Sequence, residues 1–342
     1  MHIPDGYLSP QTYVVLDIAI IPIWVVAARK VKKSLKTKQI PLMALGAAFA
    51  FIIMMFNVPV IGGATGHAIG GTLIAIILGP WAACISISVA LVIQALVFGD
   101  GGITALGANC LNMAVILPFV GFYLYRLLSG DGPSASRRTM SAGVAAYVAI
   151  VAAAVCAGIE FGIQPYIAHT AGGHALYAPY PLRVAVPAMA LEYLLFFGWV
   201  EAIVTMGVVR VLARSDAALL AAKPAAKPLR WLWAGLGVLV VLVPLGALAP
   251  GTGWGEWSGG QVKSMVGYVP GNFEKLGALW KAAMPGYLTP GMSNDLLGYL
   301  IAGIVGVLLC AGIAWGLAAV LGRRSNGAAE ASGRPTVPPP AA

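Results

Sequence analysis

Charged residues are scarce in this 342-residue chain. Lys, Arg, Asp and Glu make up only 10% of it, whereas hydrophobic residues make up 59%. Soluble domains carry about 25% charged residues, so the composition excludes an ordinary soluble protein. Apolar stretches of the ~20 residues needed to cross a bilayer recur along the whole chain. The sequence therefore predicts an integral membrane protein, and its net charge of +9 is not a nucleic-acid signal.

Cysteine pairs and nucleotide-binding loops are also missing. The four cysteines have no CxxC spacing, which excludes a zinc knuckle and a disulfide framework and leaves them as packing residues: Cys84, Cys110, Cys156 and Cys310. The pattern GxxxxGK[ST] is absent, so an ATP-driven step needs another polypeptide. Residues 1–12 contain no Lys or Arg, so we expect no cleavable signal and a mature chain that starts at Met1.

Nine apolar segments are the predicted spans: 13–28, 40–56, 67–79, 81–98, 105–125, 140–162, 185–212, 231–249 and 297–321. The third is too short to cross a ~30 Å hydrocarbon core at ~1.5 Å per residue. It follows the Gly-rich stretch Gly62–Gly66, so we expect a partial helix whose entry loop dips into the protein. Irregular backbone at that depth is tolerated only where protein or a polar cavity satisfies it, which itself indicates a site.

Basic residues set the expected orientation. The loop 29–39 is rich in Lys and Arg and should be cytoplasmic, which places the amino terminus outside and the carboxyl terminus inside. On this topology 17 Lys and Arg residues fall on the cytoplasmic side and 4 outside. The expected organisation is a seven-span core (1–212), a cytoplasmic linker (213–230), a two-span region (231–321) with an external loop (250–296), and a disordered tail (322–342).

The first two residues offer a compact chelate. The Met1 amine, the His2 amide nitrogen and the His2 imidazole lie close together in the covalent structure, and nickel and copper favour such planar nitrogen sets. His67 closes the Gly-rich loop on the same predicted external side and supplies a fourth nitrogen. The plainer alternatives are a disordered start at His2 and a His67 that pairs with a neighbouring carbonyl.

Polar residues near these histidines are candidates for orienting them. They are Asp5, Gln94, Asn109 and Asn112. Asn109 and Asn112 are three residues apart and should share one helical face. The alternative for this pair is hydrogen bonding between helices.

Two further sets of titratable residues have open roles. His169 and His174 lie in an external loop, where they collect metal or simply belong to a solvated loop. Three carboxyl groups lie within or beside spans and are candidates for ion relay or partner contact: Glu160, Glu192 and Glu201.

Four motifs in order carry a family resemblance: residues 1–10, 62–67, 79–82 and 99–113. Together they resemble the CbiM/NikM family, the substrate-binding membrane subunits (S components) of energy-coupling factor cobalt/nickel importers. The resemblance covers residues 1 to about 212. It implies a metal site on Met1, His2 and His67, a transmembrane coupling subunit of the CbiQ/NikQ type and separate ATPases of the CbiO/NikO type.

The region 231–321 resembles the two-span companion subunit of the CbiN/NikN type, fused onto the same chain. The companion's usual Pro-Asp-Gly-Leu-Glu core corresponds here to the altered stretch Pro270–Glu274.

We therefore expect an all-α, multi-pass protein of the bacterial plasma membrane that is not an enzyme and has no cofactor. Its cargo is Ni²⁺ or Co²⁺, which the sequence does not distinguish, for cobalamin or nickel-enzyme synthesis. The alternative is a proton-coupled secondary carrier that depends on the intramembrane carboxyl groups and needs no ATPase. An intramembrane enzyme is the least supported class, since no nucleophile or ligand pair shares a helix.

Overall fold

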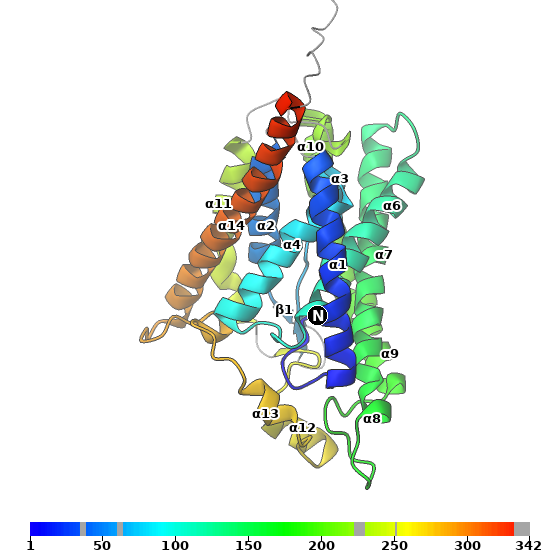
Figure 1. Ribbon diagram of the computed structural model, residues 1–342, viewed down its shortest axis with the longest axis vertical. Coiled ribbons are helices and arrows are strands. Elements are labelled where there is room, and N and C mark those ends of the chain that lie inside the picture. The colour runs from blue at the N-terminus through cyan, green and yellow to red at the C-terminus, as the bar shows by residue number, and fades with distance from the viewer. Residues whose placement is uncertain (35–38, 60–63, 222–229, 250–251, 332–342) are drawn as a thin grey trace, which may run out of the picture.

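The computed structural model describes residues 1–34, 39–59, 64–221, 230–249 and 252–331, and most of them are helical (Figure 1). The α-helices are α1 (Pro10–Ser34), α2 (Ile40–Met54), α3 (Gly71–Leu78), α4 (Pro80–Ile93), α5 (Leu106–Asn109), α6 (Leu117–Ser129), α7 (Ala135–Gly162), α8 (Gln164–Ile167), α9 (Leu182–Glu192), α10 (Gly198–Ser215), α11 (Arg230–Leu242), α12 (Gly259–Val266), α13 (Phe273–Gly277) and α14 (Asp295–Ala331). Short 3₁₀ segments complete the set: η5 (Leu219–Ala221), η6 (Val243–Leu248) and η7 (Pro285–Tyr287).

Helices that are long and apolar enough to span a membrane confirm the membrane class. Within the described residues there are six: Pro80–Phe98, Leu106–Ser129, Ala135–Ile167, Leu182–Ser215, Arg230–Leu248 and Asp295–Leu321. The shorter α2 is buried on nearly every side, as expected for an apolar helix inside a bundle. The seven-plus-two span count and the orientation stay predictions.

Three of these long segments contain a π-helical turn, where the backbone bonds i to i+5. The turns are η2 (Gln94–Phe98), η3 (Cys110–Ile116) and η4 (Tyr193–Phe197). Such turns cluster at functional sites because they redirect side chains from the regular helical faces. Here η2 begins at one predicted site residue, Gln94, and η3 contains another, Asn112.

A small sheet corrects the all-α expectation. Strands β1 (Val58–Pro59), β2 (Ala64–Gly66) and β3 (Thr252–Gly253) pair in that order, β1 and β2 antiparallel, β2 and β3 parallel. In the described part of the Gly-rich stretch, residues 64–66 form a strand, so their backbone groups take ladder partners. One of those partners, β3, comes from the fused tail, which local sequence patterns do not show. Gly62 and Gly63 lie outside the described residues.

The third predicted span begins later than expected. Helix α3 starts at Gly71 rather than at His67, because the preceding Gly70 adopts a left-handed φ of 73° that ends the irregular segment. His67 therefore lies in the four-residue connection between β2 and α3. The prediction that this helix is short and follows an irregular entry is confirmed.

The tail helices pack on the core rather than standing apart. Helix α14 runs along α2, and α11 lies beside both (Figure 1).

Helix α14 continues to Ala331, into the segment 322–342 that was expected to be disordered. No proline interrupts the chain there, since the first proline after α14 begins is Pro335. Residues 222–229 of the expected linker and 332–342 of the tail lie outside the described residues.

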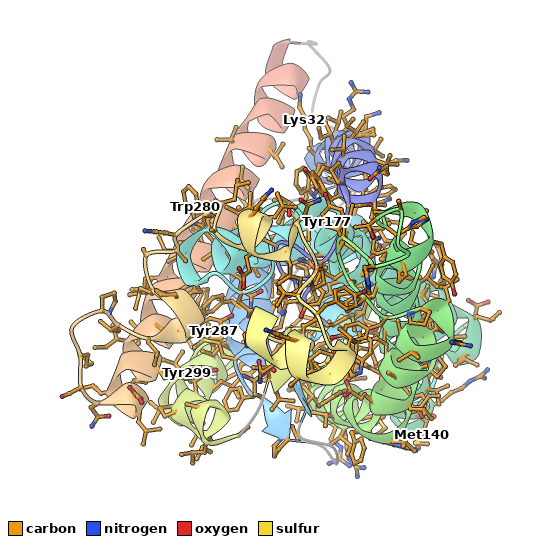
Figure 2. All side chains as sticks on the ribbon, turned by 90° about the horizontal axis from the view of Figure 1, so that it is seen from below. Lys32, Met140, Tyr177, Trp280, Tyr287 and Tyr299 are labelled. Carbon is orange, nitrogen blue, oxygen red and sulfur yellow. The ribbon has the colours of Figure 1, made fainter. Side chains whose placement is uncertain are left out.

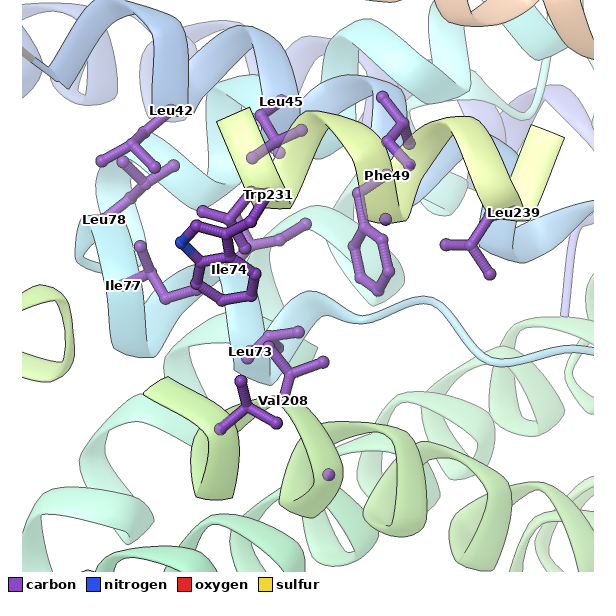
Figure 3. Close-up of a pocket in the computed structure, with 16 residues that line it drawn as sticks. Leu42, Leu45, Phe49, Leu73, Ile74, Ile77, Leu78, Val208, Trp231 and Leu239 are labelled. Carbon is purple, nitrogen blue, oxygen red and sulfur yellow. The ribbon is translucent and has the colours of Figure 1, made fainter. Parts of the chain in front are cut away.

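An apolar cavity of about 270 Å³ lies where the tail meets the core, between α2, α3, α10 and α11. Figure 3 shows Trp231 of α11 beside Ile74 and Ile77 of α3, with Val208 of α10 on the opposite wall. The lining residues are apolar, so this cavity offers no ligand atoms for an ion.

Gly306 of α14 makes the close approach to α2 possible. A Cβ at this position would overlap the ring of Phe51, which is fully buried and packs against Phe98. We expect Gly306→Ala to lower the free energy of unfolding by about 1–3 kcal/mol through overpacking. Thermal unfolding of the detergent-purified chain measures the change.

Gly312 is the matched control on the same helix, because a Cβ there meets open space. Gly312→Ala should leave the thermal midpoint unchanged or raise it slightly. Equal midpoints for the two variants would contradict the packing of α14 against α2.

Candidate metal centre

The amino-terminal segment is buried inside the protein. Met1, His2 and Ile3 are exposed by only 3%, 2% and 0%. The backbone N–H of Ile3 donates to Oδ1 of Asn109 at 2.8 Å, and Nδ2 of Asn109 donates to the Ile3 carbonyl at 3.1 Å. One asparagine side chain thus holds Ile3 as a neighbouring strand would, and it fixes the position of the two residues before it.

Asp5 secures the same segment from the other side. Its carboxylate accepts the backbone N–H groups of Ile103 at 3.1 Å and of Thr104 at 2.8 Å. Gly102 donates to the Ile3 carbonyl at 2.8 Å, and a side chain on Gly102 would overlap the backbone of Asp5. Asp5 therefore caps the turn that carries residues 103–104, and its contacts are structural.

The two histidines meet at the centre of the site. Nδ1 of His2 lies 3.3 Å from Nε2 of His67, with ring centroids 5.0 Å apart. Nε2 of His2 lies 3.3 Å from Oε1 of Gln94, and Nδ1 of His67 lies 3.2 Å from the Ala68 carbonyl. The oxygens of Gln94 and Ala68 accept a hydrogen bond from the outer nitrogen of each ring. His2 Nδ1 and His67 Nε2 are the inner nitrogens that face each other, and the carboxylate of Asp100 is a second acceptor beside His2 Nδ1.

Burial keeps both rings in the form that binds metals. It lowers the pKa of the His2 imidazole, an effect that Asp100 partly opposes. It lowers the pKa of His67 further, and the amino terminus and His2 act in the same direction. Neutral imidazole is the ligand form of histidine.

Asp100 and Tyr287 complete the surroundings of His2. Oδ1 of Asp100 lies 3.3 Å from Nδ1 of His2. The hydroxyl of Tyr287 donates to the other oxygen of Asp100 and accepts from Nε2 of Gln94 at 3.0 Å. Burial, reinforced by Asp100, raises the pKa of Tyr287, so its hydroxyl keeps the proton it donates. Figure 2 looks at the end of the molecule where Tyr287 and Tyr299 lie.

Glu256, from the fused tail, faces the amino terminus. Its Oε1 lies 3.7 Å from the Met1 nitrogen. Burial raises the pKa of the Glu256 carboxyl to about 7, against the opposing effect of the Met1 amine. Nearby, the hydroxyl of Tyr7 donates to the Trp257 carbonyl at 2.8 Å. The tail thus covers the amino-terminal segment and brings two polar side chains, Glu256 and Tyr287, to the site.

The other predicted residues are placed elsewhere. Asn112 donates to Glu160 at 2.7 Å instead of facing the histidines, because the π-helical turn η3 separates it from the face of Asn109. His169 contacts the Thr170 carbonyl at 3.1 Å, and the His174 ring packs on Tyr268. Both of these histidines are solvent-exposed loop residues.

Glu192 and Glu201, the remaining intramembrane carboxyl groups, differ from each other. Glu192 is the last residue of α9 and is half-buried. Glu201 is fully buried and accepts backbone hydrogen bonds from Ile69 and Gly70, close to His67.

Sequence reasoning missed Asp100, Glu256 and Tyr287. Asp100 lies in the motif 99–113, six residues after Gln94, and this proximity was an available signal. Glu256 and Tyr287 lie in the tail loop, and no local pattern indicates that this loop returns to residues 1–2.

In the described part of the chain, no group of three or more His, Cys, Asp and Glu side chains is arranged to hold a metal.

Comparison with known proteins identifies the core. The family described as "Cobalt uptake substrate-specific transmembrane region" (CbiM) matches residues 2–219. The chain belongs to the CbiM family. The resemblance inferred from the four motifs is confirmed, and this CbiM protein is a multi-pass membrane component of nickel or cobalt transport.

The tail of this CbiM protein matches a second family, the PDGLE domain, over residues 229–323. The match confirms the companion-type resemblance despite the altered Pro270–Glu274 core.

Relatives with the same two-part organisation extend along nearly the whole chain. The "Fused nickel transport protein NikMN" of Rhodobacter capsulatus is 50% identical over 92% of this chain and 96% of its own length. The "Probable fused nickel transport protein LarMN" of Lactiplantibacillus plantarum is 44% identical over 90% and 95%. A crystal structure of a transition metal transporter is similar with a TM-score of 0.59 and 55% identity, over 63% of this chain and 94% of that one.

Asn109 offers a direct test of how the amino terminus is held. Asn109→Leu removes both bonds to Ile3; the carbonyl keeps Gly102 as a donor, but the buried N–H is left unpaired, which costs about 1–3 kcal/mol. We expect amide hydrogen exchange in residues 2–8 to accelerate roughly tenfold or more, measured by mass spectrometry on the purified chain.

Asn112→Leu is the control, since Asn112 is also buried but bonds to Glu160. It should leave exchange in residues 2–8 unchanged. Unaltered exchange in Asn109→Leu would contradict the contact with Ile3.

Proposed function

We propose that this protein is the substrate-specific component of an ATP-driven importer of the energy-coupling factor type. It binds Ni²⁺ or Co²⁺ through the Met1 amine, the His2 amide nitrogen, His2 Nδ1 and His67 Nε2. One observation supports this above the others. His2 Nδ1 and His67 Nε2 face each other at 3.3 Å, while Gln94 and Ala68 offer acceptor oxygens to the outer nitrogens of the two rings. With the protons on the outer nitrogens, both lone pairs point into the same gap, where one cation can accept them.

The separation of these nitrogens suits a single ion. Metal–nitrogen bonds are about 2.0–2.1 Å long, so two nitrogens on one ion are ~2.9 Å apart at a right angle and ~3.3 Å apart in a tetrahedral arrangement. The observed 3.3 Å between His2 Nδ1 and His67 Nε2 lies in this range. In a planar set, with the two nitrogens at a right angle on the ion, they would need to approach each other by only ~0.4 Å.

The amino terminus supplies the other two ligand atoms. Residues 1 and 2 are buried beside the histidine pair, so the Met1 amine, the His2 amide nitrogen and His2 Nδ1 are available to form two fused chelate rings on one ion. Glu256 and Asp100 lie around them and offset the positive charge of the cargo. Binding requires deprotonated ligand atoms, so metal uptake releases protons.

Nickel is the favoured cargo. A planar set of amine, amide and imidazole nitrogens suits nickel chemically. The relatives that match over the whole two-part chain are named nickel transport proteins. Relatives named cobalt transport protein CbiM match about 37–39% of the chain.

Energy must come from partner polypeptides, because the chain has no phosphate-binding loop. By the family resemblance, these are a transmembrane coupling subunit and cytoplasmic ATPases. The amino-terminal site then faces the extracytoplasmic side, as the distribution of basic residues predicts.

A proton-coupled carrier is less well supported. Such a carrier needs intramembrane carboxyl groups that are free to exchange protons along a path. Glu160 is engaged by Asn112 at 2.7 Å, and Glu201 by the backbone of Ile69 and Gly70. Both carboxylates therefore have structural partners.

Four extra residues before Met1 test the chelate, because a single one would place the histidine third in the chain and create a new amine–amide–amide–imidazole site. They convert the Met1 amine into an amide and displace the buried segment, so the proposed amine ligand is lost. We expect nickel affinity to fall by more than the ~10–100-fold typical of changes around a ligand set. Metal analysis and nickel titration of the purified chain measure the loss. The same residues added after Ala342 are the control, and unchanged metal binding in the amino-terminally extended chain would contradict the amino-terminal site.

Uptake of radioactive nickel in cells tests the energy source. We expect the chain with its coupling subunit and ATPases to import nickel several-fold faster than the chain alone. An ATPase variant that lacks the phosphate-binding lysine should return uptake to the level of the chain alone, and His67→Ala should abolish the stimulated part. Uptake that is independent of the ATPases and collapses with a protonophore would establish the carrier instead.

A further inference from the structure

Glu201 is a buried carboxylate that serves the segment carrying His67. It lies in α10 with 0% exposure, and its Oε2 accepts the backbone N–H of Ile69 at 2.8 Å and that of Gly70 at 2.9 Å. Within the described residues it has no Lys, Arg or His partner. Burying a carboxylate in a membrane protein without a cationic partner is costly. The two backbone hydrogen bonds therefore indicate a specific role for Glu201.

The segment it contacts has few other supports. His67, Ala68, Ile69 and Gly70 lie between the end of β2 at Gly66 and the start of α3 at Gly71. Gly70 occupies the position before α3 in a left-handed conformation and offers no side chain to cap the helix. Glu201, from another helix, accepts the two N–H groups directly before α3 instead.

The turn before α10 holds the other end of the segment. Phe197, the last residue of η4, packs so closely on Gly66 that a Cβ there would overlap its ring. Phe197 and Glu201 are four residues apart on one continuous helix. This helix therefore contacts the backbone immediately before His67 at Gly66 and shortly after it at Ile69 and Gly70.

We propose that Glu201 is a positioning residue that holds His67 Nε2 against His2 Nδ1. The inference rests on the proposed chelate and adds to it a residue that touches neither the metal nor an imidazole. One oxygen of Glu201 fixes two successive N–H groups, which sets the direction in which the backbone leaves His67. When this oxygen is withdrawn, the segment 67–70 loses its only side-chain acceptor in the described structure, and His67 no longer completes the nitrogen set.

Three substitutions separate this role from general destabilisation. Glu201→Gln keeps an oxygen acceptor at the same reach. Glu201→Asp keeps the charge but withdraws the oxygen by one methylene group, and Glu201→Leu removes it. Each is made in the full chain and also combined with His67→Ala. Monodispersity and thermal midpoint in detergent show whether each variant is folded. If Glu201→Leu does not fold, Glu201→Asp alone tests the proposal.

Nickel affinity and the visible absorption band of bound Ni²⁺ are the two readouts. We expect Glu201→Gln to bind within a few-fold of the unmodified chain and to keep its spectrum. Glu201→Asp and Glu201→Leu should lose roughly 10–100-fold in affinity and give the spectrum of His67→Ala, because both leave a three-nitrogen set. In the His67→Ala background the Glu201 changes should cost nothing further.

Two outcomes would overturn the proposal. One is unchanged affinity and spectrum in a folded Glu201→Asp. The other is a loss of nickel affinity in the Glu201 variants that adds to the loss caused by His67→Ala. Additive losses would indicate that Glu201 acts on the fold alone. If His67→Ala itself binds nickel normally, the chelate is wrong and the positioning role fails with it. If only the Glu201 variants bind normally, the chelate stands without this residue.

Discussion

The pair of hydrogen bonds between Ile3 and Asn109 is the interaction on which the site depends. A chain terminus is ordinarily mobile, because few contacts offset its conformational entropy. Here one side chain satisfies both the N–H and the carbonyl of Ile3, and the turn at Gly102 adds a third bond. Met1 and His2 then have little freedom left and remain buried beside His67. Preorganisation of this kind lowers the cost of ordering ligands when an ion arrives.

The second constraint concerns irregular backbone within a membrane protein. The segment 64–70 carries His67 and is not helical, so every buried N–H and carbonyl in it needs a partner. Strand β2 is paired on both sides, and Glu201 receives the two N–H groups that follow. A helix in place of this segment would satisfy its own backbone groups, but the helical repeat would then set the direction of the His67 side chain. The irregular path lets the imidazole reach His2, at the expense of recruiting acceptors from α10 and from the tail.

Sequence patterns predicted what is local and missed what is distant. The lengths of the apolar segments predicted a membrane protein, and the positions of His2 and His67 in the sequence predicted a pair. In the structure, Nδ1 of His2 and Nε2 of His67 lie 3.3 Å apart. Helical spacing failed at Asn112, because a π-helical turn alters which residues share a face. Strand β3, Glu256 and Tyr287 reach the site from more than 180 residues away along the chain, and no periodicity encodes such a return. Glu201 was visible as an intramembrane carboxyl group, but its backbone partners were not.

The fused tail forms part of the surroundings of His2. Helix α14 packs along α2, and Phe51 of α2 contacts both Phe98 at the end of η2 and Tyr287 of the tail loop. Tyr287 in turn bonds to Gln94 and Asp100, which face His2. Packing of the tail helices and the surroundings of His2 are therefore parts of one contact network. Covalent linkage keeps the tail at high effective concentration. A loop that covers the site from the same chain is then present at every binding event, whereas a separate companion subunit would first have to associate.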